Sequence, residues 1–404
     1  MNNLSKLAIV SAFCLYAGSS FAAGYQLNEY SMTGLGRSFA GAGVVGDDFS
    51  ALAYNPAGMI LNKTSGVQGG LTVAQIHSKI TGDENQRTKM NFGVPLPHAF
   101  GQYKINDRFT AGLGIYAPYG LKTKYKRNSF VAAEGVNSEL EIIDIAPALA
   151  YKATDKLSIG ASVIARYIHG NMSNTMPTNS PYGTGFSEFD LDGWTAAWTV
   201  GAMYEFTPQT RIGVTYKAKS MQTVKGKHRL SGFNVLPAPY PNKNQKVDNG
   251  EASPDLPQSI LISGYHQLNE KWGLSSSVRW TDWKDSFPEF TLESSLGGKT
   301  VNESWRETWT ISFGADYYLN ENWTLRAGTA WDQSPVRNKY HRTARIPDSN
   351  RVWLSAGASY TNGNIQVDAG YAHLFMKNSQ VQDGISAHYK SYSNMFGLQL
   401  QYKF

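Results

Sequence analysis

The stretch from Gly41 to Gly46 matches a motif of cofactor chemistry. It is a G-x-G-x-x-G pattern, which in dinucleotide-binding proteins lets the backbone approach a pyrophosphate. That chemistry requires a strand before the glycines, a helix after them and an acidic residue about 20 positions on. Residues 63–66 at that distance read Lys-Thr-Ser-Gly. We therefore predict no NAD site and interpret the glycines as closely packed, adaptable backbone.

Other side chains that could catalyse a reaction or bind a metal have no matching spacing. The eight histidines are scattered without metal-ligand spacing, and no G-x-S-x-G motif is present. The single cysteine, Cys14, lies in the first 22 residues, so the mature chain would have no disulfide and no thiolate metal site. We expect no enzyme activity, no metal and no cofactor. A lipase using serine and histidine is the enzyme alternative that motif absence leaves open.

Residues 1–22 are typical of a secretory signal peptide. Lys6 precedes an apolar run from Leu7 to Ala17, which is too short to span a bilayer. Ser20-Phe21-Ala22 supplies small residues at the cleavage positions. We therefore expect an exported protein whose mature chain begins at residue 23 or 24.

The composition favours a transmembrane β-barrel. After residue 22 there is no run of 18 apolar residues, which excludes a helical membrane protein. The 23 Tyr and 10 Trp residues are many for a soluble domain and suit the aromatic girdles of a barrel. The formal net charge of +6 is mild for 404 residues, so we expect no nucleic-acid partner.

The C-terminal residues alternate up to the last position. Phe396, Leu398, Leu400, Tyr402 and Phe404 fall on one face, with glycine, glutamine and lysine between them. A free soluble sheet would avoid such an apolar edge. It is typical of the closing strand of a bacterial outer-membrane barrel. We therefore expect the barrel-assembly machinery to recognise the strand that ends at Phe404.

From residue 66 onward, fourteen alternating runs predict fourteen strands, an even number as bacterial barrels require. They are 66–80, 92–105, 108–121, 138–153, 157–171, 191–206, 210–227, 257–268, 272–286, 304–319, 323–334, 350–361, 364–378 and 391–404. Short turns alternate with long connections, which are 81–91, 122–137, 172–190, 228–256, 287–303, 335–349 and 379–390. Such barrels place short turns in the periplasm and long loops outside.

The predicted fold is all-β, a 14-stranded antiparallel transmembrane β-barrel over residues 66–404. Residues 23–65 are Gly-rich and lack strand pattern. Because both ends of the barrel are periplasmic, this segment enters from that side, and we predict an N-terminal hatch that plugs the lumen. The location that follows is the outer membrane of a Gram-negative cell, in contact with its lipid and lipopolysaccharide.

The strand faces opposite the apolar ones are rich in bases. The basic residues expected to point inward are Arg166, Arg211, Lys217, Arg279, Arg306, Arg326 and Arg351. Asp316 and Asp368 share that side. Most of these residues fit a solvated interior of mixed charge, and one or two of the bases could hold an anionic ligand.

The third predicted strand contains Pro118 and Gly120. Proline removes a ladder donor and belongs at edges or bulges. Pro118 therefore either marks the end of the strand or forms a kink that opens a lateral gap in the wall.

Two of the predicted external loops carry much apolar surface. Phe186 and Phe189 lie in 172–190, and Phe233 and Leu236 lie in 228–256. Apolar surface of this extent indicates loop packing or capture of a hydrophobic ligand.

Several stretches, taken together, resemble the FadL family of outer-membrane long-chain fatty acid transporters, whose relatives import aromatic hydrocarbons. In the N-terminal part they are Gly24-Tyr25-Gln26-Leu27-Asn28-Glu29, Gly34-Leu35-Gly36-Arg37, Asp47-Asp48 and Asn55-Pro56-Ala57. Later they are Asn322-Trp323-Thr324, Asp332 to Val336, Ile346-Pro347-Asp348 and Trp353 to Gly357. The resemblance covers the mature chain in order.

The resemblance implies a route for the ligand. In the family, external loops catch it, a tighter site near the hatch N-terminus holds it, and a kink in the third strand releases it sideways. The family's N-terminal Phe falls on Tyr25, and the hatch Asn falls on Asn55, followed by Pro56 and Ala57. The basic residue that contacts the ligand carboxylate falls on Arg306.

A second basic partner on the fifth strand is placed on Arg166 by strand face, although plain alignment favours His169. The function expected from the resemblance is passive uptake of hydrophobic compounds, above all long-chain fatty acids. The alternatives are uptake of aromatic hydrocarbons and a surface adhesin or phage receptor with a sealed barrel.

Overall fold

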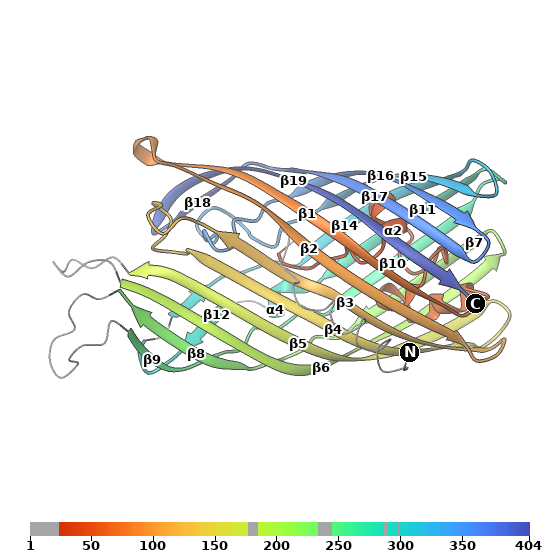
Figure 1. Ribbon diagram of the computed structural model, residues 1–404, viewed down its shortest axis with the longest axis horizontal. Coiled ribbons are helices and arrows are strands. Elements are labelled where there is room, and N and C mark those ends of the chain that lie inside the picture. Colours follow the sequence, from red (N-terminus) through yellow and green to blue (C-terminus); the bar gives the residue numbers. More distant parts are fainter. Residues whose placement is uncertain (1–23, 177–184, 233–244, 287–288, 298) are drawn as a thin grey trace, which may run out of the picture.

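The wall of the protein is one antiparallel sheet that closes on itself. A computed structural model describes residues 24–176, 185–232, 245–286, 289–297 and 299–404, so the predicted signal peptide lies outside the described residues. The sheet closes because β1 (Gly66–Gly82) pairs with both β2 (Arg87–Lys104) and β19 (Ile385–Lys403). Figure 1 shows the resulting barrel lengthwise.

The barrel has fourteen strands, as predicted, when the broken strands β7/β8 and β9/β10 are each counted once. Between β2 and β19 the wall contains β3 (Phe109–Lys124), β4 (Asn137–Lys152), β5 (Leu157–Met176), β6 (Gly185–Thr207), β7 (Thr210–Lys217), β8 (Val224–Ser231), β9 (Gln245–Ala252), β10 (Ser259–Gln267), β11 (Trp272–Thr281), β14 (Thr308–Tyr318), β15 (Trp323–Asp332), β16 (Arg351–Asn362) and β17 (Ile365–Met376). The connections hold η2 (Asp83–Asn85), α4 (Trp283–Ser286), β12 (Glu289–Glu293), β13 (Lys299–Asn302) and β18 (Ser379–Asp383).

The long connections predicted at 172–190 and 228–256 are wrong in extent. The first is largely taken up by the ends of β5 and β6, and the second by parts of β8 and β9. The predicted strand 210–227 is interrupted between β7 and β8, and its neighbour is interrupted between β9 and β10. The two breaks lie side by side, joined by a single bridge between Ser220 and Leu256. Pro254 and Pro257 within the second break have no N–H for the ladder, which accounts for the interruption.

The outer face of the wall is apolar, as the alternation predicted. Val163 and Phe313 are 66% and 59% exposed on the isolated barrel, and a bilayer would cover them. Trp272 and Trp323 begin strands directly after short turns. Trp272 packs on Tyr317 with ring centroids 4.8 Å apart, which is the placement expected of an aromatic girdle.

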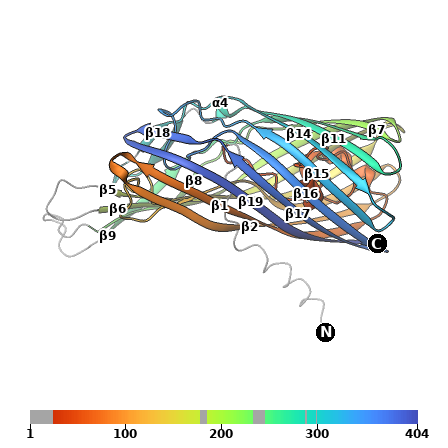
Figure 2. The same cartoon turned by 90° about the horizontal axis from the view of Figure 1, so that it is seen from above.

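The N-terminal segment, residues 24–65, lies inside the barrel in the half toward the C-terminus (Figures 1 and 2). It contains three short helices, which are α2 (Met32–Gly36), α3 (Ala51–Tyr54) and η1 (Pro56–Leu61). α2 packs on β15, β16 and β17, whereas η1 packs on β4, β5 and β6. None of the helices in the described residues is long and apolar enough to cross a membrane.

Short polar side chains cap these helices. The Ser31 hydroxyl accepts the Gly34 N–H at 2.9 Å and so caps α2. Asn55 Oδ1 accepts the Ala57 N–H at 3.1 Å, with Pro56 at the first helical position of η1. Because helices this short are unstable alone, the wall must hold them in place.

An ion network fixes the segment to the wall. Arg37 contacts Asp47 at 2.7 Å within the segment and Asp316 of β14 at 2.8 Å. Arg326 of β15 contacts the same two carboxylates at 2.9 and 3.0 Å. Although burial opposes ionisation, Arg37 and Arg326 hold the pKa of Asp47 well below its ordinary value. Two cations and two anions balance, so the network is neutral.

Glu29 is a buried carboxyl group in the same segment. It is 2% exposed, Oε2 accepts the Asn28 N–H at 2.7 Å, and Oε1 has no partner among the described residues. Burial raises the pKa of Glu29 to about 7 from 4.5. The folded segment therefore binds more protons than the unfolded one between these values. The contribution of protonated Glu29 to the stability of the segment is therefore fully present below about pH 4.5, and it is lost as the pH rises to about 7.

We expect Glu29→Gln to stabilise the N-terminal segment above pH 7 by up to about 3 kcal/mol, because the amide keeps the acceptor and cannot ionise. At pH 4 the gain should vanish. Hydrogen exchange of the Leu35 amide, which donates to the Ser31 carbonyl at 2.9 Å, reports this stability. A gain of equal size at both pH values would show that ionisation of Glu29 is not its cause.

Candidate ligand-binding site

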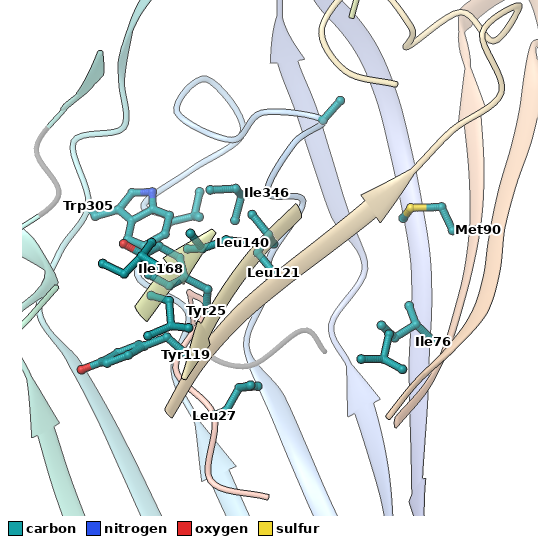
Figure 3. Packing of buried hydrophobic residues seen from close by; sticks show 14 of the residues in the cluster. Tyr25, Leu27, Ile76, Met90, Tyr119, Leu121, Leu140, Ile168, Trp305 and Ile346 are labelled. Atoms are coloured by element: carbon teal, nitrogen blue, oxygen red, sulfur yellow. The ribbon is translucent and has the colours of Figure 1, made fainter. Parts of the chain in front are cut away.

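An apolar pocket lies in the lumen above the N-terminal segment. Its lining comes from inward positions on neighbouring strands and two loops, at one level of the barrel. The residues are Tyr25, Leu121, Leu140, Ile168, Gly170, Met172, Phe189, Leu191, Val224, Ala252, Pro254, Leu292 and Ile346. Figure 3 shows Tyr25, Ile168, Leu140, Leu121 and Ile346 gathered on one side of β3. No charged side chain among the described residues borders this pocket.

Aromatic rings close the pocket around Tyr25. Its ring lies 4.6 Å from Trp283, 5.7 Å from Trp305 and 6.1 Å from Tyr119, between ring centroids. Gly24 has a φ of +64°, and a Cβ there would lie 3.0 Å from atoms of both indoles. The Gly24 N–H donates to Asp348 Oδ2 at 3.1 Å. The start of the N-terminal segment is therefore held tightly beneath the pocket.

Strand β3 contains a bulge beside this pocket. Its pairing with β4 shifts register between Tyr116 and Tyr119, so Ala117 and Pro118 together oppose one residue of β4. Pro118 therefore lies within the strand, which continues to Lys124, and does not mark its end.

The ladder between β2 and β3 stops at the same height. It runs from Lys104 and Thr110 to Ala99 and Ile115, and does not continue beyond that pair. On β2 the unpaired part contains Pro95 and Pro97, which have no N–H to donate to a ladder. Among the described residues, the wall therefore lacks main-chain pairing between β2 and β3 from this point outward. The prediction rested on Pro118 alone, and Pro95 and Pro97 were a further signal that it did not use.

The N-terminal segment covers part of the free edge of β3. The Leu27 N–H donates to the Pro118 carbonyl and the Gly120 N–H to the Tyr25 carbonyl, both at 2.8 Å. Gln26 and Tyr119 form the bridge between them. Unpaired backbone groups are costly inside a membrane. The N-terminal segment thus supplies hydrogen-bond partners to a part of β3 that does not pair with β2.

The predicted loop residues fall in different places. Phe189 lines the pocket and stacks on His228 with ring centroids 3.8 Å apart. Phe186 lies under the Arg127 guanidinium, 3.9 Å from it, and is absent from the lining. Both belong to strand β6, so their assignment to a loop was wrong. Phe233 and Leu236 lie outside the described residues.

The two predicted cations do not border the pocket. Arg166 is fully buried and binds both oxygens of Asp144, at 2.6 and 2.8 Å. Its third contact is the Ser220 hydroxyl at 2.7 Å. Arg306 precedes β14, and its Nε donates to the Ser334 carbonyl at 3.1 Å. The structure thus gives each guanidinium a protein partner, and it brings neither into the lining with Tyr25.

Asn55, Pro56 and Ala57 anchor the segment at its other side. A Cβ on Gly160 of β5 would lie 2.5 Å from Pro56 and Ala57 backbone atoms, so the glycine permits close approach. Asn55 Nδ2 donates to the Ala202 carbonyl of β6 at 3.1 Å. None of the three lines the pocket, although all lie against the wall.

Two large site residues, Trp283 and Trp305, were not predicted from the sequence. Both are fully buried against Tyr25. Trp283 belongs to the short helix α4, and Trp305 lies just before β14. The available signal was the placement of two tryptophans near the ends of predicted strands, which we interpreted as part of the wall.

A fourteen-stranded barrel that encloses an apolar pocket beside a break in its wall has the form of an outer-membrane transport channel for hydrophobic compounds. The chain belongs to the family described as outer membrane protein transport protein (OMPP1/FadL/TodX), which it matches over residues 13–404. Its place in the outer membrane follows, and transport by the family agrees with the expectation that the chain is not an enzyme.

Relatives cover the chain nearly end to end. The 47 kDa outer membrane protein of Pasteurella multocida is 30% identical, with 100% of this chain and 99% of that protein aligned. The long-chain fatty acid transport protein of Salmonella typhi is 26% identical, with 94% of each chain aligned.

Solved structures share the fold. A Pseudomonas aeruginosa FadL homologue superposes with a TM-score of 0.86 at 26% identity, covering 95% of this chain and 100% of that one. The Pseudomonas putida toluene transporter TodX gives a TM-score of 0.73 at 20% identity, covering 88% and 94%. At this identity, the similarity to TodX shows a shared fold only.

Proposed function

We propose that the protein takes up long-chain fatty acids passively through the outer membrane. The observation that carries this proposal is the apolar pocket around Tyr25 and Phe189, set directly beside the unpaired edge of β3. An acyl chain in this pocket gains about 0.8 kcal/mol for each methylene removed from water. The Salmonella typhi relative is a long-chain fatty acid transport protein, which supports the proposal.

Release would follow from movement of the N-terminal segment, residues 23–65, acting as a hatch. The backbone hydrogen bonds between Tyr25 or Leu27 and β3 are few, so their loss would free the edge beside Pro118. A ligand leaving between β2 and β3 stays in an apolar environment, whereas a path through the hatch would expose its chain to water. The ligand's own gradient supplies the driving force.

Assembly and surroundings complete the proposal. The last strand, β19, pairs with β1 and β17, and it is followed directly by Phe404, which is 62% exposed. We infer that the barrel-assembly machinery recognises this strand, and that the outer wall contacts membrane lipid and lipopolysaccharide.

Filling the pocket tests the proposal. Ala252 of β9 is buried in the lining, so we expect Ala252→Phe to abolish oleate binding and uptake by occupying the space of the acyl chain. The control is Ala161→Phe on the lipid face of β5, which should leave both unchanged. Uptake of radiolabelled oleate is measured in a Gram-negative host without its own transporter. Normal uptake by Ala252→Phe would contradict a role for the pocket.

Aromatic hydrocarbons are the second candidate. The observation in their favour is that the described residues of the pocket lining include no charged side chain, since a neutral hydrocarbon needs no partner for a head group. Binding of toluene and oleate to the purified protein separates the two. Toluene binding without oleate binding would favour the hydrocarbon channel.

A further inference from the structure

Lys217 differs from the other bases that point into the barrel. Each of the other six predicted inward bases donates a hydrogen bond to protein. Their partners are Asp144 for Arg166, the Val44 and Val45 carbonyls for Arg211, Asn28 for Arg279, the Ser334 carbonyl for Arg306, Asp47 for Arg326 and Asp348 for Arg351. Lys217 Nζ makes no hydrogen bond to any described residue.

The carboxylate nearest to Lys217 is already occupied. Asp144 Oδ2 lies 3.8 Å from Nζ, beyond hydrogen-bonding distance, and Asp144 is bound on both oxygens by Arg166. The Lys217 side chain is only 12% exposed. A buried ammonium group without a hydrogen-bonded partner is costly. This cost falls if a ligand anion accepts a hydrogen bond from the ammonium group.

Lys217 borders a small polar cavity beneath Tyr119. Arg279, Thr199, Thr215 and Ser259 line it, together with the Gln26 to Leu27 stretch and Pro118. The Thr215 hydroxyl is buried and has no hydrogen-bond partner in the described part of the chain. The cavity therefore offers an ammonium group and a free hydroxyl donor, with a guanidinium at its border.

The cavity adjoins the apolar pocket through one side chain. The Tyr119 ring lies 6.1 Å from the ring of Tyr25, which lines the apolar pocket, and 5.3 Å from Lys217 Nζ. Figure 3 shows Tyr119 below Tyr25 and above Leu27. An amphipathic molecule could thus place its chain above Tyr119 and its head group below.

The charge around Tyr119 is unbalanced toward the positive. Arg166 and Lys217 both lie near its ring, at 5.4 and 5.3 Å, and Arg279 borders the same cavity. Asp144 contacts Arg166 and Lys217. Arg279 also borders a second cavity with Asp332, but that carboxylate already pairs with Arg351 at 3.4 Å. An anion would be attracted to this place more strongly than to the uncharged pocket above it.

We propose that Lys217, Arg279 and Thr215 form an anion site that takes the carboxylate of the transported fatty acid, next to the wall break at Pro118. This inference rests on the proposed function and deepens it. It orients the ligand with its head group toward the N-terminal segment. It also makes the ionised acid, and not its ester or a hydrocarbon, the preferred cargo.

Replacing Lys217 by methionine tests the site with two probes, oleate and methyl oleate. Purified protein in detergent should bind oleate about tenfold or more weakly after Lys217→Met, because a charge-assisted hydrogen bond is lost. Binding of methyl oleate should not change. Lys217→Arg should restore the preference for oleate. Folding is preserved in this design because Arg166 still balances Asp144, and heat-dependent mobility of the barrel in gels checks it.

Arg306→Met is the matched control, since Arg306 is the base that the family resemblance favoured. An unchanged oleate affinity in Lys217→Met, or loss of the preference in Arg306→Met alone, overturns the anion site and leaves the transport proposal intact. If the wild-type protein binds neither probe, the transport proposal itself fails, and the anion site fails with it.

Discussion

Replacing Arg37 by alanine should loosen the N-terminal segment and make the barrel leak. The substitution leaves Asp47 and Asp316 with Arg326 as their remaining cation. Breaking a buried ion network by removing one partner costs about 3–5 kcal/mol. The undocked fraction of the segment should rise by about two to four orders of magnitude, since every 1.4 kcal/mol is tenfold. Ion conductance of single barrels in planar bilayers measures the effect directly.

Two variants accompany this experiment. Lys104→Ala removes an ion pair with Asp107, whose side chain is almost fully exposed, and should leave the conductance unchanged because surface pairs contribute little. Asp316→Asn added to Arg37→Ala restores neutrality and should recover part of the seal. If Arg37→Ala conducts no more than the wild type, packing alone holds the segment.

Repairing the wall beside β3 should abolish uptake while leaving binding intact. Deleting Pro118 removes the extra residue of the bulge, so that Ala117 alone separates the buried side chains of Tyr116 and Tyr119, which then fall on the same face because the side-chain period of a strand is two. Valine in place of Pro95 and Pro97 supplies the missing N–H donors of β2. The ladder between β2 and β3 can then extend beyond Ala99 and close the lateral path.

The expected result is uptake of radiolabelled oleate at the level of cells without the protein, together with normal oleate binding by the purified barrel. Pro147→Val is the control, because Pro147 lies in β4 opposite Leu113 of β3, and β4 pairs with β5 before and after this position. It should leave uptake unchanged. Undiminished uptake in the repaired barrel would mean that the ligand leaves by another path.

Much of the wall could be predicted from local pattern. Because a strand alternates its faces strictly, the residues that meet lipid, such as Val163 and Phe313, could be assigned without a partner strand. The number of strands followed from the same alternation. Its failures fall where backbone chemistry interrupts the pattern, at Pro254 and Pro257 in the broken eighth strand. The predicted loops were too long because polar strands that extend beyond the membrane lack the apolar face that the pattern relies on.

The amino-acid sequence by itself determined that the chain forms a closed barrel, which side chains face inward, and that Pro118 disturbs a strand. Only the tertiary structure decided what the inward residues contact. Arg166 meets Asp144, and Lys217 is left without a hydrogen bond. The physical reason is that lumenal contacts join residues far apart in sequence, and barrel closure and the docked N-terminal segment set their height and partners. The alternation of a strand determines which face a side chain lies on, but it does not determine which residue lies opposite that side chain.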